Sequence, residues 1–198
     1  MHRNLSQVIR TDTENTTNGE RLLEGKTVNL RVKEKEDLEL SVEWLNNPDF
    51  FGEYEPLVQL SKTELQKMYD NKSQDEGWFF IEKKDGSKVG NINHRPVGTA
   101  QEIGYTLLPS ERKKGYCSEA VTIMVDYLFL SKDIVRVQAH TDLKNVGSQK
   151  VLERAGFKKE GTIRKEEFIR GEWRDKYLYS ILREEWKEPK ILTGTEKK

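Results

Sequence analysis

Cysteine is almost absent from this sequence, since Cys117 is the only one among 198 residues. A single cysteine excludes an internal disulfide and fits a reducing compartment. No apolar run approaches the roughly 20 residues that span a bilayer, and the opening residues lack the apolar centre of a signal peptide. We therefore expect a protein that is neither exported nor inserted in a membrane, with the cytoplasm as its location.

Net charge is also absent, because 34 basic residues balance 34 acidic ones. This balance argues against a general nucleic-acid binder, although it permits a local basic groove. Hydrophobic and charged residues each make up 34% of the chain, which is typical of a protein with a heavily solvated surface. The length suits one well-cored domain, and we find no internal repeat and no low-complexity segment.

The apolar pattern predicts one domain at residues 26–186, between an arm at 1–25 and a charged tail at 187–198. The polar arm is expected to be flexible, or to add a strand or turn if it docks. The periodicity predicts a strand, two helices, three antiparallel strands, a helix, a strand, a helix and a closing hairpin. Their ranges are 27–33, 37–46, 61–68, 77–82, 88–97, 102–108, 118–129, 134–139, 145–155, 157–169 and 173–182. This order predicts an α/β fold around one mixed, mostly antiparallel sheet.

A basic turn follows the predicted strand at 102–108. Pro109 ends this strand, because proline cannot donate a hydrogen bond to a sheet, and apolar residues at helical spacing come next. The first N–H groups of a helix lack partners and carry the positive end of its dipole, so an anionic group fits there. Arg112, Lys113 and Lys114 add positive charge at the same place. The turn is either an anion site or an ordinary basic surface turn.

The run Arg112-Lys113-Lys114-Gly115-Tyr116-Cys117 resembles the Arg/Gln-x-x-Gly-x-Gly/Ala signature of the GNAT family of N-acetyltransferases, with Cys117 in the place of the final Gly or Ala. The segment Asn145-Val146-Gly147-Ser148, followed by residues 151–157, resembles the Asn-x-x-Ser/Ala…Gly-Phe segment of that family. The order of elements from residue 27 to 184 is also the family's. The flanks around Trp44-Leu45 and Gly171-Glu172-Trp173-Arg174-Asp175 resemble its RimJ/RimL branch.

The resemblance implies a single GNAT domain that moves the acetyl group of acetyl-CoA to a primary amine by direct attack in a ternary complex, without a metal. The family's fourth and fifth strands, here 102–108 and 134–139, would splay around acetyl-CoA. The turn would bind its pyrophosphate, and the strand backbone would pair with its pantetheine and supply the oxyanion donor. The implied cofactor residues are Thr106, Leu107, Leu108, Arg112, Lys113, Lys114, Gly115, Tyr116, Cys117, Ser118, Asn145 and Ser148.

For catalysis, the sequence offers Glu102 as general base and Ser148 as general acid. Glu102 begins the strand beside the expected thioester, where partial burial would raise its pKa toward a useful value; a solvated carboxylate is the alternative. Many relatives place a tyrosine seven residues after the asparagine, but Leu152 stands there. Ser148, one helical turn after Asn145, is the nearest substitute, with a water molecule as the alternative. Cys117 is discounted as a nucleophile, although a helix N-terminus would favour its thiolate.

The acceptor is expected beside the loop at 49–60, where carboxylates and aromatic residues are mixed. Glu53 and Glu55 would attract a cationic amine such as a polyamine, an aminoglycoside or an amino acid, and a protein N-terminal α-amine is the other candidate. His94 is a further substrate-site candidate, because an imidazole titrates near neutral pH. The alternatives are ordinary loop carboxylates and a structural strand histidine.

A different class of function stays open at this point, namely a non-catalytic CoA- or nucleotide-binding regulatory module, because the usual tyrosine is missing. A nucleic-acid-binding domain built on residues 112–114 and 158–159 would show a steep salt dependence of binding, and the neutral charge balance disfavours it. A homodimer through the closing hairpin is a further alternative. Trp173 and Trp186 belong either to such an interface or to the core.

Overall fold

One sheet organises the molecule. The computed structural model describes residues 22–189 and orders eight strands as β1-β2-β3-β4-β5-β6-β8-β7. The strands are β1 (Leu22–Glu24), β2 (Val28–Val32), β3 (Gly77–Lys83), β4 (Lys88–Val97), β5 (Ala100–Leu107), β6 (Arg136–Asp142), β7 (Lys158–Ile169) and β8 (Glu172–Leu182). All neighbours are antiparallel except β5 and β6, which are parallel. The predicted mixed, mostly antiparallel sheet is therefore confirmed.

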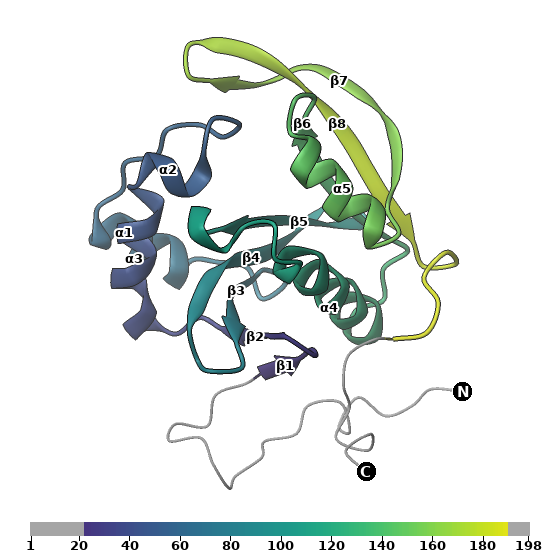
Figure 1. Ribbon diagram of the computed structural model, residues 1–198, viewed down its shortest axis with the longest axis horizontal. Helices are drawn as coiled ribbons and strands as arrows, with labels where there is room; N and C mark the ends of the chain where they lie inside the picture. Colours follow the sequence, from purple (N-terminus) through teal and green to yellow (C-terminus); the bar gives the residue numbers. More distant parts are fainter. Residues whose placement is uncertain (1–21, 190–198) are drawn as a thin grey trace, which may run out of the picture.

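Helices cover both faces of this sheet. Within the described residues they are α1 (Leu38–Leu45), α2 (Pro48–Phe51), α3 (Lys62–Asp70), α4 (Tyr116–Ser131) and α5 (Val146–Arg154), with 3-10 turns η2 (Lys35–Asp37) and η3 (Pro109–Glu111). Successive side chains of a strand point to opposite faces, and β3 shows the result. Phe79 and Ile81 join the main core with α4, whereas Phe80 packs against Trp44 and Phe50 from α1 and α2. Figure 1 shows α1, α2 and α3 grouped away from α4 and α5.

Local sequence signals set several helix boundaries. The predicted capping box at α3 is confirmed, because Ser61 Oγ accepts from the Glu64 N–H at 3.2 Å and Glu64 Oε2 accepts from the Ser61 N–H at 2.8 Å. Pro48 does not merely end α1. It is the first residue of α2, whose N-cap Asn47 accepts from the Asp49 N–H at 2.9 Å. Proline suits this place because its fixed φ is helical and its missing N–H is not needed.

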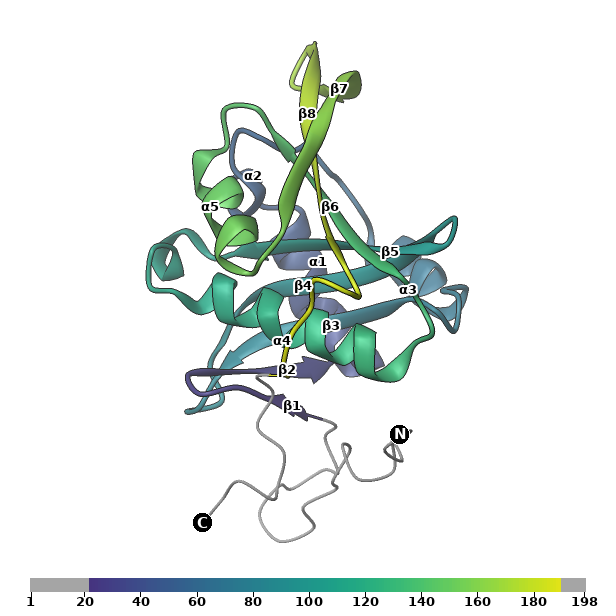
Figure 2. The same ribbon diagram turned by 90° about the vertical axis from the view of Figure 1, so that its right-hand side faces the viewer.

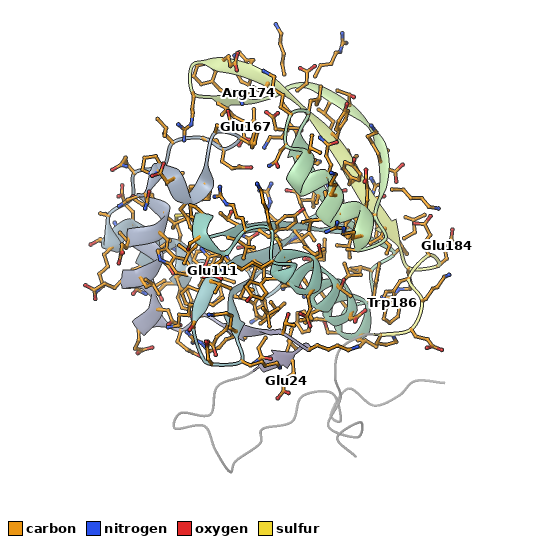
Figure 3. All side chains as sticks on the ribbon, in the orientation of Figure 1. Glu24, Glu111, Glu167, Arg174, Glu184 and Trp186 are labelled. Carbon is orange, nitrogen blue, oxygen red and sulfur yellow. The ribbon has the colours of Figure 1, made fainter. Side chains whose placement is uncertain are left out.

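The ends of the domain carry two further features. Residues 22–24 of the predicted arm pair with β2, so this part of the arm adds a strand to the sheet, as one of the two alternatives expected. Residues 1–21 of the arm and 190–198 of the tail lie outside the described residues. Trp186, which is labelled in Figure 3, packs on Phe129 with ring centroids 5.5 Å apart and donates from Nε1 to Asp126 Oδ1 at 2.7 Å, so it belongs to the core. Trp173 is 59% exposed. No helix in residues 22–189 is long and apolar enough to cross a membrane.

The feature that positions the site is a wedge between β5 and β6. The two strands pair only at Gln101–Val137 and Glu102–Gln138, and they separate beyond these pairs (Figure 2). The predicted splay is thus confirmed, although β6 begins at Arg136 instead of residue 134 and continues to Asp142. Val135, whose apolar character suggested a strand residue, is 63% exposed.

Candidate active site

A cavity of about 1380 Å³ opens at the wedge. One side, which we call the cofactor end, is lined by the β5–α4 turn and α5. The other side, which we call the acceptor end, is lined by β4, β6, the loop after α2 and the β7–β8 hairpin. The predicted cofactor residues that line the cavity are Thr106, Leu107, Arg112, Lys113, Gly115, Cys117, Ser118, Asn145 and Ser148, whereas Leu108, Lys114 and Tyr116 do not.

The β5–α4 turn leaves the first amides of α4 without a side-chain cap. Gly115 is the N-cap with φ of 90°, a left-handed conformation that suits glycine, and no side chain caps the helix. Helix α4 begins at Tyr116, two residues before the predicted Ser118. Because the first N–H groups of a helix have no intrahelical partner, those of residues 116–118 are the donors that an anion would find here.

Arg112, which the resemblance assigns to pyrophosphate binding, donates to three backbone carbonyls. Its Nη2 donates to the Phe50 carbonyl at 2.7 Å and to the Asp49 carbonyl at 3.2 Å, and its Nε donates to the Leu107 carbonyl at 3.2 Å. The guanidinium thus joins α2 to β5. Lys114 pairs with Glu111 at 3.1 Å. An Arg112 substitution would therefore loosen α2 as well as change the charge of the turn.

Besides Arg112, the cations that line the cofactor end of the cavity are Lys113, Lys150 and Arg154. The nearby thiol of Cys117 is neutral, because burial raises its pKa to about 12. The expectation that the helix N-terminus favours a thiolate is wrong here, since desolvation dominates.

The strand backbone at the wedge divides into two sets of donors. The Leu108 N–H donates to the Val89 carbonyl at 2.9 Å, so it faces β4 and is not available to a thioester. Backbone groups alternate in direction along a strand. The N–H groups of Leu107 and Tyr105 therefore point to the opposite edge, which β6 leaves open.

The candidate general acid Ser148 lies in a small hydroxyl network. The Asn145 side chain caps α5 by accepting from the Ser148 N–H at 3.0 Å, which confirms the predicted N-cap. Ser148 Oγ lies 2.9 Å from Tyr105 Oη. Burial raises the pKa of Tyr105, so its phenol stays protonated. The sequence analysis missed Tyr105. It looked for a tyrosine only on the helix, where Leu152 stands at the expected position.

Glu102 is held by two donors at the acceptor end. Arg95 Nη2 lies 2.6 Å from Oε1, and Gln138 Nε2 donates to Oε2 at 3.1 Å. Burial alone would raise the pKa of Glu102, but these hydrogen bonds outweigh it and lower the pKa. The expectation of a raised pKa is therefore wrong, because partners from β4 and β6 stabilise the carboxylate.

A histidine missed by the sequence analysis lies next to Glu102. His140 Nε2 is 3.8 Å from Glu102 Oε2, and its Nδ1 is 2.5 Å from Glu166 Oε1 on β7. All three residues line the cavity. The sequence signal for His140 was its spacing of two from Gln138, which places both side chains on one face of a strand. The predicted strand ended at residue 139 and therefore left His140 out.

Of the three predicted substrate-site residues, two line the cavity and one does not. Glu53 and Glu55 line the acceptor end, and burial raises the pKa of Glu55, with the nearby Lys176 opposing the shift. His94 does not line the cavity, because its ring lies on the α4 face of β4, with its centroid 6.0 Å from that of Tyr127. It is 2% exposed, and its Nδ1 lies 2.8 Å from Gln101 Oε1. Burial lowers the pKa of His94. His94 therefore fits the alternative of a structural strand histidine.

The β7–β8 hairpin forms a roof over the acceptor end. In Figure 1 it arches toward α2 and the loop that follows. Arg170 Nη2 donates to the Gly52 carbonyl at 2.8 Å, and Arg174 Nη1 donates to the Glu53 carbonyl at 3.1 Å. Glu167 and Arg174 are opposite each other in the hairpin and lie on the same part of it (Figure 3). The roof is thus tied to the loop by arginine–carbonyl bonds.

Arg170→Ala is expected to raise the KM for the acceptor about five-fold, because losing one or two charge-assisted hydrogen bonds frees the roof by about 1 kcal/mol. The KM for acetyl-CoA should not change, since the cofactor end is elsewhere. Arg164→Ala on β7, an exposed residue outside the cavity lining, is the matched control. Steady-state kinetics with both substrates varied would check this, and an equal rise in both KM values would contradict it.

Comparisons with known proteins agree with this architecture. The family model described as Acetyltransferase (GNAT) domain matches residues 27–158. A probable N-acetyltransferase of Bacillus subtilis, YjcK, is 31% identical over 175 residues, which cover 81% of this chain and 97% of that protein. The chain belongs to the GNAT acetyltransferase family, and it is an acetyltransferase.

Two solved structures show the same fold. The spermidine N-acetyltransferase from Vibrio cholerae, in complex with CoA and spermine, has a TM-score of 0.72 at 22% identity, covering 80% of this chain and 97% of that one. The ribosomal-protein-S5-alanine acetyltransferase from Vibrio fischeri has a TM-score of 0.72 at 24% identity, covering 84% and 99%. At these identities the likeness concerns the fold.

Proposed function

We propose that this enzyme transfers the acetyl group of acetyl-CoA to a small, cationic primary amine by direct attack in a ternary complex. The observation that carries the proposal is the separation of charge along the cavity. The cations of the cofactor end are Arg112, Lys113, Lys150 and Arg154. The carboxylates on the other side are Glu53, Glu55, Glu102, Glu166 and Glu167. The two basic side chains there, Arg95 and Lys176, are each paired with a carboxylate.

The cofactor end fits acetyl-CoA in three respects. The uncapped amides of residues 116–118 and the cations beside them suit a pyrophosphate. The free edge of β5 offers N–H groups to a pantetheine arm, and a fixed N–H beside a thioester carbonyl stabilises a developing oxyanion. Acetyl-CoA supplies the activated acetyl group when it is bound. The cavity would hold it against the amine, and such positioning contributes up to roughly 7–11 kcal/mol in ideal cases.

The hydroxyl pair of Ser148 and Tyr105 supports a route for the proton that the departing thiolate requires. Ser148 Oγ lies within hydrogen-bond distance of Tyr105 Oη, so a proton given up by one is replaced by the other.

The acceptor end favours a small amine over the N-terminus of a folded protein. The hairpin is tied to the loop at residues 52–55 and covers the acceptor end. A slender amine enters a covered site more readily than the N-terminus of a folded protein does. The carboxylates attract a second positive charge on the acceptor.

The test is thiol release from acetyl-CoA with matched amines. We expect turnover with 1,3-diaminopropane and spermidine to exceed that with propylamine by at least about ten-fold, because the second ammonium pairs with a carboxylate. Aminoglycosides, amino acids and short peptides with free N-termini complete the panel. Equal rates with propylamine and 1,3-diaminopropane, or turnover with peptides alone, would reject the small cationic acceptor. Absence of thiol release with every amine would reject amine acetylation at this site.

A further inference from the structure

Three side chains from three strands form a row at the acceptor end, where β5 and β6 separate. Glu166 on β7 lies 2.5 Å from His140 Nδ1, and Glu102 on β5 lies 3.8 Å from His140 Nε2. The last paired residues of the two parallel strands are Glu102 and Gln138, and His140 follows on β6 just beyond them. The imidazole therefore stands at the mouth of the wedge, where the amine and the thioester would meet.

The contact with Glu166 orients the imidazole. A carboxylate accepts a hydrogen bond, so Nδ1 carries the proton in the neutral ring and Nε2 keeps its lone pair. Nε2 faces Glu102 across 3.8 Å, a separation that leaves no strong hydrogen bond between them. An ammonium placed beside this gap reaches the carboxylate of Glu102 and the lone pair of Nε2 at the same time.

Glu102 itself is a poor base in this arrangement. Arg95 and Gln138 donate to its two oxygens and stabilise the carboxylate, so it has little tendency to take a proton. Arg95 pairs with Oε1, whereas Oε2 is held by the neutral Gln138 amide and faces His140, so Oε2 is the oxygen that would accept from an ammonium. Attraction and proton removal are thus separated between two neighbouring groups.

We propose that His140, held by Glu166, is the catalytic base that removes a proton from the acceptor ammonium, while Glu102 binds that ammonium. This inference rests on the proposed function. The ammonium gives one proton to His140 Nε2, and the lone pair of the neutral amine attacks the thioester carbon, forming the C–N bond before the C–S bond breaks. The nitrogen then loses its second proton, and the departing thiolate gains a proton through the Ser148–Tyr105 pair. The products are the amide and the thiol, and His140 returns its proton to solvent. The geometry follows the logic of a base oriented by a carboxylate.

The surroundings of His140 compensate the charge that it gains. Glu102 faces it from β5 and Glu166 from β7, so a carboxylate lies on either side of the imidazolium. The other charged groups that line this part of the cavity are Arg95 on β4, Glu55 in the loop after α2, Glu167 on β7 and Lys176 on β8. Arg95 and Lys176 are each neutralised by a carboxylate, Glu102 and Glu167 respectively.

The experiment measures kcat/KM for the best acceptor of the panel between pH 6.5 and 9.5. His140→Gln should lower kcat/KM about 100-fold at pH 7, the usual contribution of a general base, without changing the KM for acetyl-CoA. Alkyl ammonium groups lose their proton to solvent near pH 10, so the deficit should shrink as the pH approaches that value. Imidazole added to His140→Ala should restore part of the rate.

Glu166 is a positioning residue in this scheme, so Glu166→Gln should lower kcat about ten-fold with the KM for acetyl-CoA unchanged. The matched control is Glu160→Gln, an exposed carboxylate on the same strand that lies outside the cavity and accepts from Ser180. Circular dichroism and acetyl-CoA binding by calorimetry establish that each variant is folded.

The outcomes separate the two proposals. A folded His140→Gln variant within three-fold of the wild type, or one whose deficit is the same at pH 7 and pH 9.5, overturns the role of His140 and leaves the proposed function standing. Should the variant fail to fold, Glu166→Gln decides instead: a rate equal to that of Glu160→Gln overturns the role. A wild-type enzyme that releases no thiol with any amine rejects the proposed function itself.

Discussion

Lys33→Met is expected to stabilise the protein by on the order of 3–5 kcal/mol below pH 7. Lys33 is only 7% exposed, with Ser41 Oγ at 3.2 Å from Nζ and the Phe80 ring centroid at 4.5 Å. Burial lowers the pKa of Lys33 to about 7, although the nearby Asp37 carboxylate opposes this shift. Methionine has a similar length, adapts to irregular core space and carries no charge to bury.

The gain should depend on pH with a definite sign. The folded-state pKa of Lys33 is about 7, below the value of 10.5 for the unfolded chain. The cost of burying the ammonium is therefore complete below pH 7, declines between pH 7 and 10.5, and disappears above that range. Urea unfolding at pH 6.5, 8 and 9.5 should show the advantage of the variant shrinking at each step.

The matched control is Lys35→Met, since the Lys35 side chain is 58% exposed and pairs with Asp70. Its effect on stability should be small at every pH, because solvent screens a surface ion pair. If Lys33→Met were less stable than the wild type at pH 6.5, the attraction between Lys33 and Asp37 would exceed the cost of burying the ammonium, and desolvation would not be the dominant effect at this position.

The second large effect is expected at Gly90, where β4 and β5 approach closely. A Cβ built at this residue would lie 2.2 Å from the Thr106 carbonyl oxygen and 2.7 Å from Leu107 Cδ2. Backbone atoms cannot move aside as a flexible side chain does, so Gly90→Val should cost at least about 3 kcal/mol, or prevent folding. Gly90→Ala should cost about 2 kcal/mol, because it adds only the first carbon of the clash.

Gly161→Ala is the control, because Gly161 is also a strand glycine and a Cβ there meets nothing within 4 Å. Its stability should change by less than about 0.5 kcal/mol in the same urea titration. Gly90→Ala should in addition weaken acetyl-CoA binding, since Leu107 lines the wedge. Gly90→Ala with wild-type stability and wild-type binding would show that β4 adjusts without strain.

Most helices and strands of the fold could be predicted from local sequence patterns. Alternation along β4 and the closing hairpin, and the capping signals at Ser61 and Asn145, depend on neighbours within a few residues. The wedge followed from the family resemblance, because no local signal says where two parallel strands separate. The errors lie at element ends such as Val135 and Pro48, where exposure and helix geometry depend on packing.

The candidate site was less accessible, because its properties arise from partners distant in sequence. The turn that contains Arg112 predicts an anion ligand, but the acceptors of this guanidinium include carbonyls of residues 49 and 50. Burial at Glu102 is predictable from its strand, whereas the donors from β4 and β6 that reverse the effect on its pKa are not. His140 acquires its significance from Glu166, which lies on another strand.

The position of β8 has a consequence for the nascent chain. Although β8 is synthesised after all the other strands that the structure describes, it lies between β6 and β7 in the sheet. While residues 172–182 are still inside the ribosome, β6 exposes an unpaired edge, and the bond from Arg174 to the Glu53 carbonyl does not exist. The cofactor end of the cavity, which is lined by the β5–α4 turn and α5, is thus made first, and the roof over the acceptor end is completed only when β8 is inserted.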